Sequence, residues 1–568
     1  MNLKNKILLA LLGILPVMSV AQDKKVWASG AARSIFQQNN LTSAGDTITP
    51  KRLNSGHTLV DLAVNAKPND QTFIHGMVRI RNDFGGFWNS GVTFDIRQLY
   101  VKGLVKDAIR YQLGDINYKL SPYTFYSQSE ELSGHQTEIL NIYRDITQYD
   151  MFFSNDNTWR QQGAAVDFTL DFTKIIKEAN VNLFASRNRP SDFNQQSDRI
   201  FLGGNANITI IDKLKVGVNY IDLMDVAGTA RTNKEFHNPV ISGTTEYSKA
   251  LNGIDLRFQS ESGVSQMYEL NGTSPALKDY FVDLKLQGIL KKIPINFGFN
   301  YINVGPQFRS IGAQTKRVNF SGQNRLYSVY GLNQQTRAIN SADLLQDAAL
   351  YQLSFNPDLD DYNPAFQNIQ PYGTATPNRK GLILNINHES KTKSYELGAT
   401  YKNLSEVVGQ GTIDLRKFSE ISANGILRIH KLLSNYKNIL EISTGVSSGV
   451  TKRTTAFPLA NVDLSNLLAD FGFKVGMSKN LDLLLNYRIV NAKGIEFKSV
   501  RGSFTEVIDF DKYETQLSEK LLVVAMRYSF SEKNKLNLVW QKINWEDSKS
   551  GKNNYGMSQF AVVYSLMF

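Results

Sequence analysis

The chain has 568 residues, of which 42% are hydrophobic, 11% aromatic and 20% charged. These fractions exclude extensive disorder, and a mean hydropathy of −0.29 is too low for a bundle of membrane-spanning helices. The formal net charge of +11 favours anionic partners, and the absence of cysteine excludes disulfides and thiolate metal sites.

The N-terminus has the order of a secretory signal peptide. Lys4 and Lys6 precede an apolar run that is too short to cross a bilayer, and small residues follow up to Ala21. We therefore expect residues 1–21 to be removed and residues 22–568 to form one domain. The Ala-Gln pair at the cleavage point resembles exported proteins of the Bacteroidota, which implies a Gram-negative source.

Segments in which apolar and polar residues alternate recur from residue 26 to the C-terminus. Clear examples are "AAVDFTLDF" at 164–172, "YFVDLKLQG" at 280–288, "INFGFNY" at 295–301 and "LLVVAMRYSF" at 521–530. Alternation with a period of two places the apolar side chains on one face of a strand, and runs of about ten residues are typical of transmembrane β-strands.

The connections between these segments fall into two classes. Short polar turns are expected at 67–70, 211–213, 261–263, 390–393, 478–480 and 531–535, and long loops at 117–160, 223–250, 304–379 and 489–518. Short periplasmic turns that alternate with long extracellular loops are typical of outer-membrane barrels. The sequence therefore predicts an all-β fold, a single large antiparallel transmembrane β-barrel of about 22 strands, within a range of about 20–24.

The last strand is apolar on one face up to the C-terminal residue itself. The alternating residues are Phe560, Val562, Tyr564, Leu566 and Phe568. Most chains end in polar, frayed residues, but a barrel must pair its last strand with its first. The stretch resembles the C-terminal β-signal of outer-membrane proteins, which implies the barrel-assembly machinery as a partner.

The sequence leaves no room for a separate N-terminal plug domain, because alternation begins near residue 26 or, at the latest, residue 57. If the lumen is occupied, the loops 117–160 and 304–379 are expected to fold into it. The second loop contains "SADLLQDAALYQL" at 341–353, which predicts a short helix capped by Ser341.

A hairpin near the N-terminus carries a family resemblance. "FDIRQLYVKG" at 94–103, followed by "IRYQLGDI" at 109–116, resembles a hairpin of porin-type families that include anion-selective and sugar-selective channels. The chain as a whole resembles uncharacterised porin-like outer-membrane barrels of the Bacteroidota. The resemblance implies a channel and assigns no solute or site residue.

The alternation places an equal number of acids and bases on the inward face as candidate pore-lining residues. The bases are Arg79, Arg97, Arg110, Lys215, Arg257, Lys285, Arg428, Lys474, Arg488 and Arg527. The acids are Asp61, Asp95, Asp167, Asp171, Asp255, Asp283, Glu396, Glu441, Asp470 and Asp482. One interpretation is an anion ladder along a pore. The even mixture of signs favours the other, in which charges pair across strands to satisfy a polar wall.

Aromatic residues gather near strand ends. They are Trp88, Tyr100, Tyr220, Tyr301, Tyr487, Trp540 and Trp545. We interpret them as girdles at the two membrane interfaces, with a sugar-stacking role inside the lumen as the alternative.

No catalytic, metal or cofactor motif stands out. The histidines are scattered, and the chain has no HExxH, GxSxG or P-loop sequence. Asp61 and His75 on neighbouring strands suit a hydrolase, but a satisfied polar pair in the wall is the favoured interpretation. Because bases are interleaved with acids, nucleic-acid binding is not expected.

Three functions remain. The favoured one is an outer-membrane porin-like channel for passive or selective passage of small polar or anionic solutes, because a plug domain is missing. The second is a loop-plugged barrel that serves surface assembly, secretion or adhesion together with envelope proteins. An outer-membrane hydrolase ranks last. Membrane lipid and lipopolysaccharide would surround the barrel in each case, and the solute and the oligomeric state stay open.

Overall fold

The structure is a computed structural model of the whole chain. It describes residues 25–41, 52–83, 92–127, 138–140, 149, 157–172, 175–211, 213–273, 275–314, 368–433, 438–456, 458–501, 507–549 and 554–568. The expected signal peptide, the helix at 341–353 and Trp88 lie outside these residues. Within them, no helix is both long enough and apolar enough to cross a membrane.

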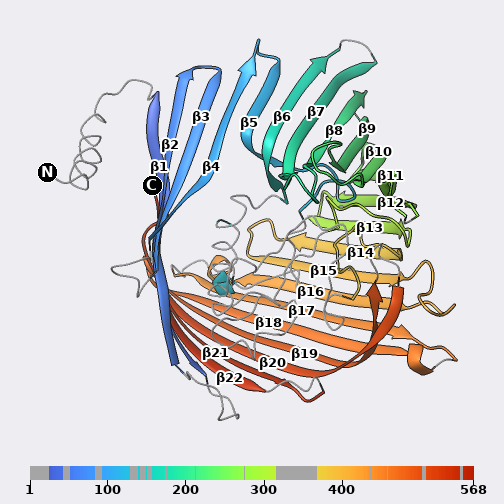
Figure 1. The fold of residues 1–568 in the computed structure, drawn as a ribbon. Helices are drawn as coiled ribbons and strands as arrows, with labels where there is room; N and C mark the ends of the chain where they lie inside the picture. Colours follow the sequence, from blue (N-terminus) through green and yellow to red (C-terminus); the bar gives the residue numbers. More distant parts are fainter. Residues whose placement is uncertain are drawn as a thin grey trace.

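The fold is a closed antiparallel β-barrel, as the sequence predicts. Its 22 strands are β1 (Val26–Leu41), β2 (Arg52–Asn69), β3 (Thr72–Asp83), β4 (Val92–Val105), β5 (Ile109–Tyr118), β6 (Trp159–Asp171), β7 (Ile176–Arg189), β8 (Arg199–Ile210), β9 (Leu214–Asp225), β10 (Glu235–Leu251), β11 (Ile254–Leu270), β12 (Leu277–Leu290), β13 (Ile295–Val304), β14 (Arg379–Glu389), β15 (Tyr395–Ser405), β16 (Lys417–Arg428), β17 (Leu440–Arg453), β18 (Val462–Ser478), β19 (Leu481–Arg501), β20 (Val507–Ser531), β21 (Asn534–Asp547) and β22 (Tyr555–Met567). Short 3-10 helices occur at η3 (Ile429–Lys431) and η4 (Pro458–Ala460). Each strand pairs with the next, and β1 pairs with β22 to close the wall (Figure 1).

The connections at the two ends of the barrel differ in length. At the end that carries both termini they are 70–71, 106–108, 172–175, 211–213, 252–253, 291–294, 390–394, 429–439, 479–480 and 532–533. At the other end they are 42–51, 84–91, 119–158, 190–198, 226–234, 271–276, 305–378, 406–416, 454–461, 502–506 and 548–554. The predicted alternation of short and long connections is present, and all but one of the predicted short turns coincide with or adjoin a short connection.

The turn predicted at 261–263 is wrong, because these residues lie in the middle of β11. The chain reverses earlier, at residues 252–253, where Gly253 adopts a φ of 90°. Gly263 has a packing role instead. A Cβ there would lie 2.7 Å from the ring of Phe281, so only glycine leaves room for that inward ring.

Two predicted long loops are also wrong. Much of 223–250 belongs to β9 and β10, where buried Asn238 and Ser242 make the inward face polar, so the alternation is hidden in the sequence. The stretch 489–518 belongs largely to β19 and β20. These strands exceed the roughly 9–11 residues that a bilayer requires, so their paired ends form an extension of the wall.

Only some of the residues that were predicted to form aromatic girdles lie on the outward face of the barrel. Tyr220, Tyr487 and Trp540 are on the outward face and well exposed, and Tyr301 shares the outward parity of its strand. Tyr100 instead stacks on inward-facing His75, with ring centroids 4.9 Å apart. Trp545 is buried against Leu468 and Leu517. Both were misassigned because proximity to a strand end does not fix the face on which a side chain lies.

The pairing of β1 with β22, called the closure seam below, explains the apolar C-terminus. The Phe568 amide donates to the Gly30 carbonyl at 3.0 Å, and the Gly30 amide donates to the Phe568 carbonyl at 2.9 Å. Phe560 and Phe568 are 41% and 49% exposed and lie on the outer face. The outer face of β22 is therefore apolar to its last residue, although recognition of this strand by assembly machinery stays a prediction.

Amide side chains join the inner face of the closure seam. Gln541 on β21 donates to Gln559 on β22 at 3.0 Å, and Gln559 donates to Asn39 at 2.6 Å and to Gln37 at 3.2 Å on β1. All four side chains are buried. Buried amides are stable only when they are paired, so this ladder favours one register of closure.

We expect Gly30→Ala to destabilise the barrel. A Cβ at Gly30 would lie 2.1 Å from the Asp61 carbonyl and 2.8 Å from the Phe568 ring, and such overpacking costs about 1–3 kcal/mol. The measurement is the fraction of refolded protein that migrates as a compact band before heating. Gly243→Ala is the matched control, because no atom lies within 4 Å of its Cβ position. Equal folding of the two variants would contradict the role of the seam.

Candidate functional site

The inner wall carries cross-strand ion pairs. Arg79 contacts Asp61 at 2.6 Å, with both side chains buried, and Arg110 contacts Asp167 at 2.5 Å. Arg488 forms an equally direct, fully buried pair with Asp470. In each case the two residues are directly opposite in the strand register. The register therefore places opposite charges face to face along the wall.

The other predicted wall residues are held by more varied partners. Arg428 contacts Glu396 at 2.6 Å and Glu441 at 3.3 Å. Lys285 contacts Asp283, two residues away on β12, at 3.1 Å.

Near the end with short connections, Arg257 contacts Glu246 at 2.6 Å and Lys291 contacts Asp255 at 2.8 Å. Asp95 is opposite Arg79 in the register, and Arg97 occupies the bulge between β3 and β4, where its carbonyl accepts from Arg160. The structure thus brings most predicted charges into pairs, while their lining of a conducting path stays a prediction.

Parts of both predicted loops fold against the inner wall. We call residues 119–127, 305–314 and 368–378 the inward segments. Together with wall residues of β5 to β13 they form an apolar cluster: Ile116, Tyr123, Phe125, Trp159, Phe184, Phe201, Ile221, Leu223, Phe236, Val240, Met267, Phe281, Val304, Phe308, Ile311, Ala313 and Ala375. Tyr123 stacks on Phe281 with centroids 4.0 Å apart, and burial raises the pKa of its hydroxyl. The lumen on this side is therefore packed with protein.

Hydrogen bonds fix the inward segments to the wall and to each other. Asn238 on β10 donates to the Arg309 carbonyl at 3.1 Å and accepts from the Ile311 amide at 3.0 Å. The indole of Trp159 donates to the Gly312 carbonyl at 2.8 Å. Ser121 donates to half-buried Glu261 on β11 at 2.5 Å. These bonds satisfy backbone groups that would otherwise be buried without partners.

Glu138 extends the ionic contacts across the lumen. Its carboxylate binds Arg527 on β20 and lies 2.8 Å from the ammonium of Lys474 on β18. Burial opposes ionisation, but these two cations hold the pKa of Glu138 below its ordinary value. Tyr149, from the same connection between β5 and β6, lies over Arg79 with a centroid distance of 6.0 Å.

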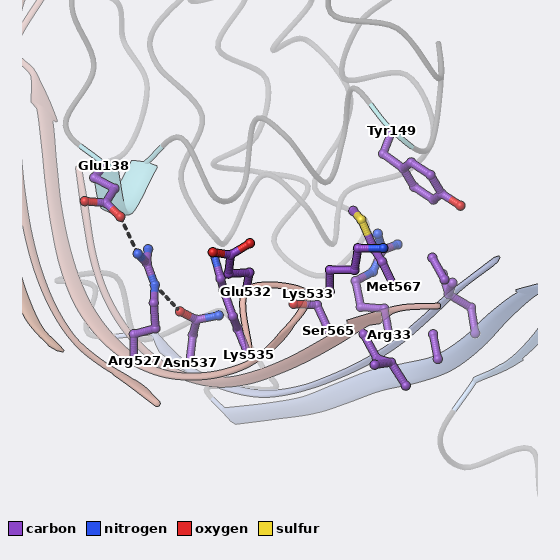
Figure 2. A pocket seen from close by; sticks show the side chains of 14 residues that line it. Arg33, Glu138, Tyr149, Arg527, Glu532, Lys533, Lys535, Asn537, Ser565 and Met567 are labelled. Atoms are coloured by element: carbon purple, nitrogen blue, oxygen red, sulfur yellow. Dashed lines mark hydrogen bonds and ion pairs between the residues drawn. The ribbon is translucent and has the colours of Figure 1, made fainter. Parts of the chain in front are cut away.

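A cavity of about 410 Å³ lies between this contact and the closure seam. Figure 2 shows the Glu138–Arg527 pair at one side of the cavity, and Arg33, Lys533 and Lys535 along the rest. Of these residues, only Arg527 was predicted as pore-lining. Lys533 and Lys535 were assigned to a turn and Glu138 to a loop, and the alternation in β1 was too weak to single out Arg33. Only strand parity in β1 and β21 could have indicated them.

Asp61 and His75 do not pair with each other, either as a polar pair in the wall, which was the favoured interpretation, or as parts of a hydrolase site. Asp61 binds Arg79, while His75 is 2.8 Å from the Asn65 side chain. Within the part of the chain that the structure describes, no three histidine or acidic side chains converge as metal ligands.

The comparisons with known proteins concern architecture. No family model and no curated protein match the sequence. Among solved structures, a BenF-like porin from Pseudomonas fluorescens Pf-5 is 9% identical with a TM-score of 0.36, over 96% of this chain and 99% of that one. OccK11 (OpdR) of Pseudomonas aeruginosa is 10% identical with a TM-score of 0.34, over 96% of both chains. The P pilus usher (PapC) translocation pore is 8% identical with a TM-score of 0.39, over 95% and 99%. At these values we transfer no residue role, solute or partner.

We expect Phe125→Ala to loosen the inward segments while the barrel stays closed. The ring is fully buried between Phe184 and Phe201, and removing it costs about 3–5 kcal/mol of packing. Hydrogen–deuterium exchange should accelerate in residues 119–127 and not in β20. Phe193→Ala is the control, because that ring is 80% exposed. Unchanged exchange in the Phe125 variant would show that the cluster does not hold the segments.

We expect the Glu138 contact to be lost in acid. Because its pKa is lowered in the folded state, the ion pairs stabilise the segment fully above the ordinary value of 4.5, and this contribution is lost as the pH falls through the lower folded value. Exchange protection of residues 138–140, corrected for intrinsic rates, should be constant at neutral pH and fall below pH 4.5. Glu138→Gln should remove this step, and a step that persists in that variant would assign it to another acid.

Proposed function

We propose that this chain is an outer-membrane porin-like channel for small polar or anionic solutes. The observation that carries the proposal is the arrangement of the wall, which is closed by hydrogen bonds on all sides, apolar outside and charged inside. A closed barrel satisfies every backbone group within a bilayer, and an inner wall of charges suits an aqueous path.

The proposal includes an orientation. Outer-membrane barrels keep short turns in the periplasm and long loops outside, so the end that carries both termini would face the periplasm. Export by a signal peptide at residues 1–21, folding by the barrel-assembly machinery, surrounding lipopolysaccharide and a Bacteroidota source belong to the same proposal. All of them agree with a wall whose outer face is apolar.

The inward segments set the route of the proposed path. They pack beside β5 to β16 and reach Glu496 on β19 through Asn368, so solutes would pass beside the strands near the closure seam. That side contains Arg33, Lys533 and Lys535, and the whole chain has a formal charge of +11. These charges favour anions over cations in the path.

Packing of the inward segments also favours a second function. A lumen partly filled by an apolar cluster suits a barrel that acts in surface assembly, secretion or adhesion rather than in conduction. The two functions differ in whether ions cross the barrel.

We expect the refolded protein to produce discrete conductance steps in a planar lipid bilayer. Under a salt gradient, the reversal potential should have the sign of anion selectivity, because the cavity beside the seam has more bases than acids. Boiled protein and detergent alone are the controls. Silence from a preparation that migrates as a folded barrel would contradict the channel and favour the assembly function.

A further inference from the structure

The cavity beside the closure seam combines positive charge with an apolar surface. Its bases are Arg33, Arg527, Lys533 and Lys535, and its acids are Glu138 and Glu532. It lies at the end of the barrel that carries the C-terminus, because both the connection 532–533 and Met567 line it. The cavity is built from five strands, β20, β21, β22, β1 and β2, on both sides of the seam, together with Glu138 and Tyr149 from one connection.

The charges inside the cavity are not balanced. Glu138 is already neutralised by Arg527 and by Lys474 outside the cavity, where the Nζ–Oε2 distance is 2.8 Å. Glu532 is then the single acid of the cavity that remains for Lys533 and Lys535. Neither lysine forms an ion pair with any described residue. Positive charge in a partly enclosed space attracts an anion more strongly than the same charge in open water.

The apolar surface of the cavity limits the kind of anion. Ala31, Leu59 and Met567 line it beside the charged groups. A fully hydrated inorganic ion gains nothing from such a surface, whereas a short hydrocarbon body loses its contact with water there. A volume of about 410 Å³ accommodates a small organic molecule.

Glu138 shows which anionic group the wall accepts. Its carboxylate reaches Arg527, whose Nε also donates to the Asn537 side chain at 3.1 Å (Figure 2). A guanidinium so oriented presents its remaining donors toward the lumen, where a carboxylate fits in a charge-assisted contact. The Glu138 carboxylate thus occupies a position beside the Arg527 guanidinium that a ligand carboxylate would share or take over.

We propose that this cavity binds a small organic carboxylate with a short apolar body. The inference rests on the proposed channel, of which the cavity would be the binding site at the periplasmic end. Lys533 and Lys535 attract the anion, the apolar residues hold its hydrocarbon body, and Arg527 accepts its carboxylate in competition with Glu138.

The test is to measure the binding of butyrate to the refolded protein in detergent at low ionic strength, by saturation-transfer difference NMR. The binding signal of butyrate should reach saturation as its concentration rises. Butylammonium, which has the same hydrocarbon body and the opposite charge, should show no saturable binding. The variant Lys533→Gln/Lys535→Gln should weaken butyrate binding about fivefold, as expected for the loss of two partly exposed ion contacts. Lys292→Gln/Lys391→Gln is the control, because it removes the same charge from other short connections and should bind as the parent does.

Acetate, observed directly, and inorganic phosphate, observed as displacement of the butyrate signal because it has no carbon-bound proton, complete the experiment. Weaker binding of both supports the apolar part of the site, and phosphate binding equal to that of butyrate would overturn the organic class of the ligand. Equal binding of butyrate by both double variants would overturn the site itself. These outcomes do not depend on conduction, so a barrel that conducts without binding butyrate refutes the site alone, and a silent barrel that binds it refutes the channel alone.

Discussion

Pairing of the last strand with the first is the constraint on which the rest of the barrel depends. A strand edge left open in a bilayer would expose amides and carbonyls at a cost of several kcal/mol each. The chain closes that edge up to its final residue, where Phe568 exchanges two hydrogen bonds with Gly30. Because β1 and β22 must be antiparallel, the first residue of β1 and the last residue of β22 lie at the same end of the barrel. Closure thereby determines an even number of strands and sets the short connections and the cavity beside the termini.

A barrel of 22 strands encloses more space than its own inward side chains fill, and this chain deals with the space in two ways. Beside β5 to β13 the inward segments supply a second layer, and the wall there is aromatic and aliphatic. Elsewhere the wall is charged and satisfied by pairs such as Arg79–Asp61 and Arg488–Asp470. A buried pair adds little net stability, but breaking it costs about 3–5 kcal/mol. The ion pairs therefore act mainly by disfavouring strand registers in which these buried charges would lose their partners.

The sequence predicted the outward-facing side chains of the barrel better than the inward-facing ones. Apolar residues face outward with strict period two, so the fold class, the strand number and the closing strand follow from local pattern. The inward face obeys no such rule, because it meets segments that are distant in sequence. Half-buried Glu261 in β11 was assigned to a turn, and Trp545 to a girdle, for this reason. The seam cavity escaped prediction because Glu138 and Lys535 come together only in three dimensions.

The inward segments are held by two kinds of contact that respond differently to the contents of the lumen. The cluster around Phe125 is apolar, and dissolved ions or small anions do not compete with it. The contact of Glu138 with Arg527 and Lys474 is ionic, and any carboxylate that reaches the same cations competes with it directly. A ligand can shift a conformational equilibrium only by binding one state better than the other. If a ligand carboxylate takes the place of Glu138 on Arg527, its binding and the release of this connection are coupled. Release would begin at the ionic contact while the apolar cluster keeps the rest of the segments against the wall.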